Sequence, residues 1–141
     1  MANEVKWKAP TSQGTGISST SLDAGNNVLG SEIDNEANLD RWMALNLTWT
    51  CSTESNAGEV IEAYIIYDVT SSAYEDGGTS EDPAKSPVAV FVDDGGTGAQ
   101  QQTIEDIPIK PFAFKILLKS ELSEDASSVT LLAETYNEEV Q

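Results

Sequence analysis

Residues that could do chemistry are few in this chain, and the most versatile of them is absent. There is no histidine, and Cys51 is the single cysteine among 141 residues. A Ser-His-Asp triad, a Cys-His pair and a zinc site built from Cys and His are therefore excluded. The glycine pairs 14/16 and 96/98 lack the third glycine of a dinucleotide-binding fingerprint. We expect no cofactor.

Carboxylate pairs are the remaining catalytic candidates, because two acids can serve a glycosidase. The adjacent pairs in turn-like segments are Asp93-Asp94, Glu75-Asp76 and Glu124-Asp125. A chain with 24 acidic residues produces such pairs by chance, so we expect solvated turn carboxylates and no enzyme. The glycine-rich loops around the first two pairs could offer oxygen ligands to calcium. Neither loop has the spacing of an EF-hand, and no metal site is expected.

The charge balance is strongly acidic, with 24 acidic residues against 7 basic ones and a formal net charge of −17. Such a surface repels phosphate backbones and anionic membranes, so we expect neither nucleic acid nor a membrane as partner. The acidity fits a solubility device or a partner with a basic face. The N-terminal segment 1–10 has no apolar run typical of a signal peptide. We therefore expect synthesis in the host cytoplasm.

Alternation of apolar and polar residues predicts strands rather than helices. The clearest run is 41–51, in which Trp49 and Cys51 share the core-facing phase. Further strands are predicted at 59–69, 88–92, 100–107, 110–120 and 129–136. Gly- and Pro-rich turns separate them, with a long loop at 71–87. The pattern predicts an all-β fold, an antiparallel β-sandwich that is jelly-roll-like.

The N-terminal region has a different composition, small and polar with two isolated apolar residues, Trp7 and Ile17. We expect residues 1–20 to be an extended arm, with a short strand at 6–8, and residues 21–141 to be the β-sandwich domain. Such an arm would lie on a partner or on a neighbouring subunit. Deleting residues 1–20 is then expected to abolish attachment and leave the sandwich folded.

Two further features are candidates for partner binding. Trp42 is out of phase with the core residues of its strand and fits an exposed contact, either with a protein or with a sugar ring. Tyr74, in the long loop, is a second candidate for sugar stacking. The segment Ile107-Pro108-Ile109-Lys110-Pro111 could form an interface ridge, because its prolines remove backbone donors and blunt a strand edge. An ordinary bend at the entry of a strand is the alternative.

Several segments together resemble a family of small bacteriophage virion proteins. They are Leu29–Asn35 leading into Leu39–Trp42, Tyr64–Asp68, Ala73–Gly78 with Asp82-Pro83, Val90–Val92, Ile107–Lys115 and Tyr136–Val140. The resemblance spans most of residues 29–140. It implies a capsid decoration (cement) protein that binds the outer surface of the major capsid protein lattice and stabilises the head. It also implies self-association, as a dimer or trimer, and a place on the surface of the virion.

Other functions remain open at this point. The chain could be another virion part, such as a tail, neck or fibre-base protein. A carbohydrate-binding sandwich is a further alternative, and a glycosidase is the last.

Overall fold

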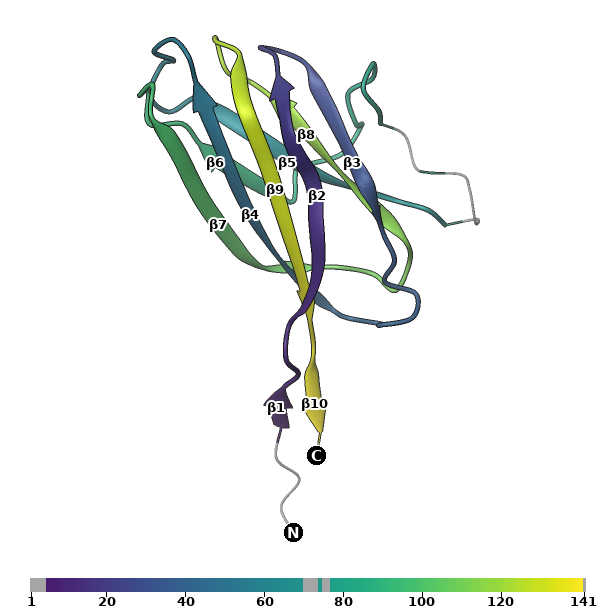
Figure 1. The fold of residues 1–141 in the computed structure, drawn as a ribbon. Helices are drawn as coiled ribbons and strands as arrows, with labels where there is room; N and C mark the ends of the chain where they lie inside the picture. Colours follow the sequence, from purple (N-terminus) through teal and green to yellow (C-terminus); the bar gives the residue numbers. More distant parts are fainter. Residues whose placement is uncertain (1–4, 70–73, 75–76, 141) are drawn as a thin grey trace.

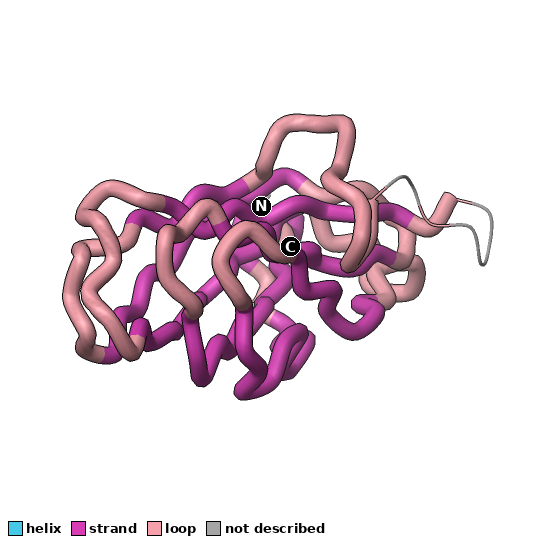
Figure 2. Tube along the Cα trace, turned by 90° about the horizontal axis from the view of Figure 1, so that it is seen from above, coloured by secondary structure: helices cyan, strands magenta, loops and turns pink. Residues whose placement is uncertain are grey.

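Two antiparallel sheets make up most of this computed structural model, which describes residues 5–69, 74 and 77–140. The strands are β1 Val5–Trp7, β2 Thr11–Leu22, β3 Asn27–Ile33, β4 Trp42–Cys51, β5 Val60–Tyr67, β6 Ala89–Val92, β7 Ala99–Pro108, β8 Phe114–Ser120, β9 Ala126–Tyr136 and β10 Glu138–Val140. The described residues contain strands and loops but no helix (Figures 1 and 2). The predicted all-β antiparallel sandwich is therefore confirmed.

The strand order shows how the chain builds the two layers. One sheet has the order β2-β9-β4-β7, and the other has the order β3-β8-β5-β6. Successive strands from β2 to β9 lie in opposite sheets, except β5 and β6, which are neighbours. Strands far apart in sequence are therefore paired within each layer, and every sheet pairing is antiparallel.

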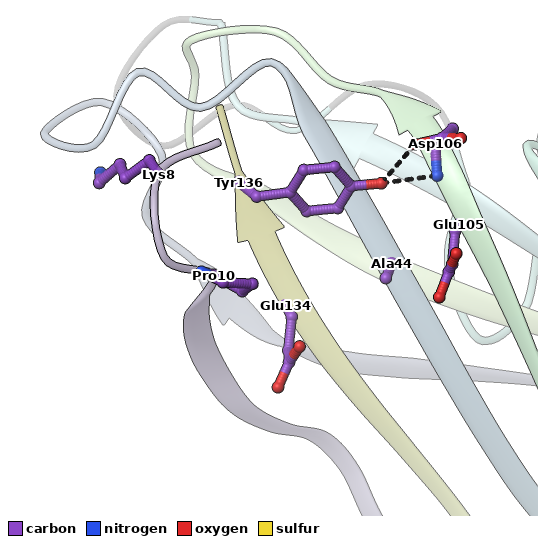
Figure 3. Close-up of a pocket in the computed structure, with 7 residues that line it drawn as sticks. All are labelled: Lys8, Pro10, Ala44, Glu105, Asp106, Glu134 and Tyr136. Carbon is purple, nitrogen blue, oxygen red and sulfur yellow. Dashed lines mark hydrogen bonds between the residues drawn. The ribbon is translucent and has the colours of Figure 1, made fainter. Parts of the chain in front are cut away.

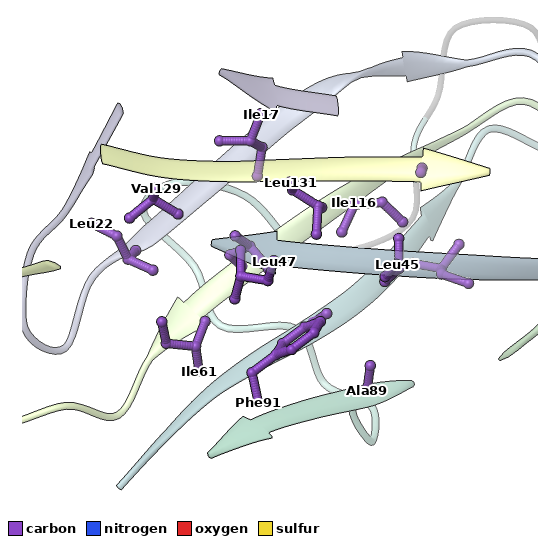
Figure 4. Packing of buried hydrophobic residues seen from close by; sticks show 14 of the residues in the cluster. Ile17, Leu22, Leu45, Leu47, Ile61, Ala89, Phe91, Ile116, Val129 and Leu131 are labelled. Atoms are coloured by element: carbon purple, nitrogen blue, oxygen red, sulfur yellow. The ribbon is translucent and has the colours of Figure 1, made fainter. Parts of the chain in front are cut away.

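The core lies between the sheets and follows the period of two that the sequence predicts. In β4, the odd-numbered positions from Met43 to Cys51 are buried, and the alternate positions are half-buried. Trp49 and Phe91 are among the largest fully buried side chains. Inward side chains of both layers point toward one another (Figure 4). The predicted core positions of Trp49 and Cys51 are confirmed.

The two outer faces differ. On the sheet that contains β5, Tyr64, Ile66 and Leu117 form a second buried cluster, with Leu29 and Tyr74 packed against it. Tyr74 comes from the long segment between β5 and β6, and its side chain covers part of that outer face. The outer face of the β2-β9-β4-β7 sheet carries half-buried and exposed side chains instead. It is the face on which a partner could lie.

Residues 11–20, expected in the N-terminal arm, lie elsewhere in the structure. They belong to β2, an edge strand paired with β9, and Ile17 is buried in the main core. The reason is cross-strand pairing: β2 supplies the outer strand of its sheet through a series of register shifts, which its small residues tolerate. Among the residues that the structure describes, the N-terminal segment outside the sandwich is much shorter. It is β1, which pairs with β10 as a separate two-stranded ribbon.

The sides of the sandwich, where edge strands of opposite sheets meet, are closed by specific residues. At one side, a Cβ on Gly30 would lie 2.8 Å from the carbonyl oxygen of Gly16, so glycine allows β2 and β3 to approach closely. At the other side, the Gln102 amide accepts a hydrogen bond from Val92 N at 3.0 Å and donates one to Val92 O. The glutamine thereby satisfies the outward backbone groups of β6 at Val92.

Candidate docking surface at the terminal end

The end of the sandwich that carries both termini is held together by buried polar residues. The ribbon β1–β10 leaves the sandwich at this end (Figure 1). Asn35 is fully buried, and its side chain donates to the carbonyl oxygens of Asp40 and Lys110 at 2.8 and 2.9 Å. These bonds tie the loop between β3 and β4 to the loop between β7 and β8. The terminal end is therefore a connected surface built from several loops.

Asp40 links this surface to the base of the ribbon. Its carboxylate is buried, accepts a hydrogen bond from Thr135 Oγ1 at 2.7 Å and lies 3.5 Å from Lys8 Nζ. Lys8 N also donates a hydrogen bond to Asn137 O at 2.8 Å, at the base of the ribbon. Lys8 therefore takes part both in this backbone hydrogen bond and in the ion pair with Asp40. The Asp40 Oδ1 atom has no hydrogen bond with good geometry, which leaves the Lys8 ammonium as its compensation. Lys8 thus fixes where the ribbon emerges.

An open groove of about 280 Å³ lies beside the ribbon base on the outer face (Figure 3). Its floor is Ala44 on β4, a small residue between Glu134 on β9 and Glu105 on β7. The pairing of β4 with β7 shifts register between Met43 and Leu45, which indicates a bulge in β7 here. The groove therefore exists because a small central side chain meets a bulged neighbouring strand.

Tyr136 holds this bulge in place. Its hydroxyl donates to Asp106 Oδ1 at 2.8 Å and accepts from Asp106 N at 2.8 Å. Asp106 has a φ of 58°, in the left-handed region that non-glycine residues seldom adopt. Burial raises the pKa of the Tyr136 hydroxyl, and its hydrogen bond to the Asp106 carboxylate raises it further. The phenol therefore stays protonated and keeps donating at neutral pH.

Trp42 lies next to the groove at the end of β4. In the register of the sheet it stands between Tyr136 on β9 and Pro108 on β7. Trp42 and Tyr136 are half-buried, and Pro108 is exposed. These residues form a strip across three strands, next to the two loops that carry the exposed Arg41 and Lys110. We call the strip and the groove together the docking surface.

The structure separates the predicted binding residues into different groups. Ile17, Ile107 and Ile109 are 4%, 3% and 8% exposed, and all belong to the core. Their chain neighbours on the ridge, Pro108 and Pro111, are exposed. The isoleucines therefore cannot form an exposed ridge, because the alternation of β7 continues past residue 107 and turns them inward. That the exposed prolines contact a partner stays a prediction.

Trp7 lies in β1, at the register of Glu138 in β10. Its side chain is outside the described part of the structure. That Trp7 contacts a partner as part of the arm stays a prediction.

The opposite end of the sandwich, which we call the far end, consists of the loops 23–26, 52–59, 93–98 and 121–125. Hydrogen bonds join them: Gly58 N donates to Asp93 O, Ser123 N to Glu59, and Ala24 N to Asp125. The acids in these loops are Asp23, Glu54, Glu59, Asp93, Asp94, Glu121, Glu124 and Asp125, and the loops contain no lysine or arginine. The molecule is therefore electrostatically asymmetric along its length.

Asp93 differs from the solvated turn carboxylate that its sequence context predicts. It is 1% exposed and accepts hydrogen bonds from Trp49 Nε1 at 2.8 Å, Gln100 Nε2 at 3.0 Å, Gly95 N at 2.7 Å and the Ser55 hydroxyl. Burial raises the pKa of this carboxyl, but the hydrogen bonds outweigh burial and leave the pKa below its usual value. The signal was available in the phase of β6, which places residues 89, 91 and 93 inward.

The other chemical candidates do not converge on a site. Asp94 is exposed, and Glu75 and Asp76 lie outside the described residues. Among the residues that the structure describes, no group of three or more acids or cysteines could hold a metal ion. The Cys51 thiol is buried, and burial together with the Asp93 charge raises its pKa. Within the same residues, no helix is long and apolar enough to cross a membrane.

Tyr74, considered for sugar stacking, has its ring and hydroxyl engaged. Lys115 Nζ lies 4.2 Å from the ring centroid, and the hydroxyl donates to Glu32. The hydrogen bond to Glu32 is the main cause that raises the pKa of Tyr74 to about 12. A sugar could stack on this face of the ring only by displacing the lysine.

Comparisons with known proteins do not assign this chain to a family. No family model matches the chain, and no curated protein matches it. Among solved structures, the chain is similar to the Drosophila NLP-core, with a TM-score of 0.30 and 14% identity over 98% of this chain and 100% of that one. That structure concerns pentamer formation and histone binding. At this TM-score the similarity supports no inference about this chain.

Proposed function

We propose that this protein is a non-enzymatic bacteriophage capsid decoration protein, which attaches to the major capsid protein lattice through its docking surface. The observation that carries the proposal is the asymmetry of the molecule. The terminal end combines Trp42 and Tyr136 with the bases Lys8, Arg41 and Lys110 as well as with acids, whereas the loops of the far end carry acids and no bases. A protein that covers a shell needs one end that binds and another that stays solvated.

The composition of the docking surface supports attachment to a protein. Trp, Tyr and Arg are the residue types that most often dominate the energy of protein interfaces. Here Trp42 on β4 is paired with Tyr136 on β9 in the register of the sheet. The small Ala44 lies near them and leaves room in the groove for a side chain of the partner. The acidic far end would keep decorated particles apart and would not capture nucleic acid released around them.

The strand order supports the jelly-roll form of the sandwich that the sequence predicts. A jelly roll has eight strands in two packed sheets, built from two Greek keys. The orders β2-β9-β4-β7 and β3-β8-β5-β6 fit this description. In this proposal the fold is a rigid platform, and the docking surface at the terminal end of one sheet does the binding.

The test is binding of purified variants to capsid shells of the phage that encodes the chain, measured by co-sedimentation. Trp42→Ala and Ala44→Trp should each weaken binding about tenfold or more, because one removes an anchor and the other fills the groove. Val90→Ala is the matched control, since Val90 is 41% exposed on β6, outside the docking surface. Circular dichroism should show that each variant is folded.

Unchanged binding of both docking-surface variants would refute the proposed attachment. Cryo-electron microscopy of particles separates the alternatives. Density at every capsomer supports a decoration protein, and density confined to the tail or neck would indicate another virion part.

A further inference from the structure

The ribbon β1–β10 is a part of the fold that the docking surface does not use. Each strand has three residues, and the ribbon extends beyond the sandwich along its length (Figure 1). A two-stranded ribbon of this length is marginal in water by itself and needs further strands to be stable.

Both edges of the ribbon are available for such strands. Within the described residues, β1 pairs with β10 and with no other strand, so each has one edge that carries unpaired backbone donors and acceptors. An open edge is a template for pairing with another chain. In the sandwich, by contrast, the edge strand β6 has its outward groups at Val92 satisfied by Gln102.

The geometry of the ribbon makes a second copy of this chain a suitable partner. Since β1 and β10 are antiparallel, rotation about an axis along the ribbon places β1 of one copy beside β10 of the next, again antiparallel. The same pairing can therefore be repeated between copies. Interfaces of this head-to-tail kind generate rings when the rotation closes. The strands would then form a small closed barrel, which leaves no edge unpaired.

The charges of the two strands favour the same partner. The β1 side of the ribbon contributes Lys6, and the β10 side contributes Glu138 and Glu139, with Lys6 at the register of Glu139. If the register within the chain is repeated between chains, Lys6 of one copy lies opposite Glu139 of the next. Opposite charges at directly facing positions stabilise strand pairs, and like charges destabilise them.

We propose that this chain self-associates into a cyclic oligomer through its terminal ribbons, with β1 of each copy paired to β10 of its neighbour. The inference goes beyond the proposed function, because it concerns contacts between copies and not attachment to a shell. For both contacts to form at once, the docking surface must stay accessible in the oligomer. That surface lies on the sandwich and not on the ribbon.

The test uses charge reversal and the mixing of variants. Lys6→Glu and Glu139→Lys each place like charges on both strands, so each purified variant should dissociate more readily in native mass spectrometry and sedimentation velocity. When the two variants are mixed, every contact between a chain of one variant and a chain of the other joins an acidic side chain to a basic one. Association should therefore recover in the mixture. The pair within each chain stays repulsive, so recovery reports contacts between chains.

The matched control mixes Lys6→Glu with Glu54→Lys, which has the same net charge as Glu139→Lys but carries its change at the exposed far end. If association recovers in this control mixture as fully as in the mixture of Lys6→Glu with Glu139→Lys, overall charge and not the ribbon drives association. That result would overturn the proposal. A wild-type chain that stays monomeric at every concentration would also overturn it. If that monomeric chain still bound shells, the proposed function would stand without the ring.

Discussion

At the scale of single residues, Asp93 is the group on which the far end depends. Its carboxylate joins the core, through Trp49, to the loop 52–59, through Ser55, and to β7, through Gln100. Buried donors need acceptors, and an indole N–H inside a core is costly when it has none. The position of Trp49 and that of Asp93 are therefore interdependent, although 44 residues separate them in sequence.

We predict that Asp93→Asn lowers the free energy of unfolding by about 2–4 kcal/mol, because the amide presents an N–H group to donors that now lack an acceptor. Asp94→Asn is the control: its side chain is exposed, and the change should be within about 0.5 kcal/mol. Chemical denaturation at pH 7 measures both. Equal effects of the two substitutions would contradict a structural role for Asp93.

The same pair of variants makes a prediction about pH. The Asp93 pKa is lower in the folded protein than in the unfolded chain, so its contribution to stability is present above the unfolded pKa, about 3.9. That contribution is lost as the pH falls through the folded pKa. The stability difference between wild type and Asp93→Asn should thus shrink below pH ~4. A difference that is constant from pH 7 to pH 2 would contradict this.

At the scale of elements, β2 shows how tertiary pairing overrides local composition. Its sequence is small and polar, and nothing in its period indicates burial apart from Ile17 and Leu22. It forms a strand because it pairs with β9, which would otherwise be the unpaired edge of its sheet over the core. The structural boundary between the extension and the sandwich lies between β1 and β2, not at residue 20.

We predict that two truncations have opposite outcomes. Removing residues 1–7 takes away β1 but keeps Lys8 and its ion pair with Asp40, so the sandwich should melt within a few degrees of the full chain. Removing residues 1–20 takes away most of β2 with Ile17, and should cost at least about 4 kcal/mol. Thermal melts followed by circular dichroism check both. A cooperative, near-native melt of the longer truncation would show that β2 is dispensable.

At the scale of the whole molecule, the net charge of −17 is distributed unevenly, and the far end concentrates acids in loops that touch one another. The ion pairs that offset this repulsion include Lys8 with Asp40, and Lys119 with Asp82 and Glu121. Self-repulsion of this kind lowers the stability of the compact state and is screened by salt.

We predict that raising the salt concentration from about 0.01 M to about 0.15 M stabilises the protein, since the Debye length falls from about 30 Å to about 8 Å. The expected rise in melting temperature is roughly 4 °C, about what 1 kcal/mol produces in a domain of this size. Sodium, potassium and tetramethylammonium chloride should act equally if screening is the cause. A falling melting temperature would instead mean that ion pairs dominate the electrostatics.

The sequence by itself determined the class of the fold, because a period of two in segments such as 41–51 and 110–120 reports which side of a strand meets a core. It also determined that Trp49 and Cys51 are buried and that Trp42 faces the other way. Only the tertiary structure decided which strands are neighbours, since pairing joins residues as distant as Thr11 and Thr135. That pairing put β2 into a sheet, brought Trp42 beside Pro108 and Tyr136, and buried Asp93 under Trp49. Such contacts depend on long-range register, which local composition does not encode.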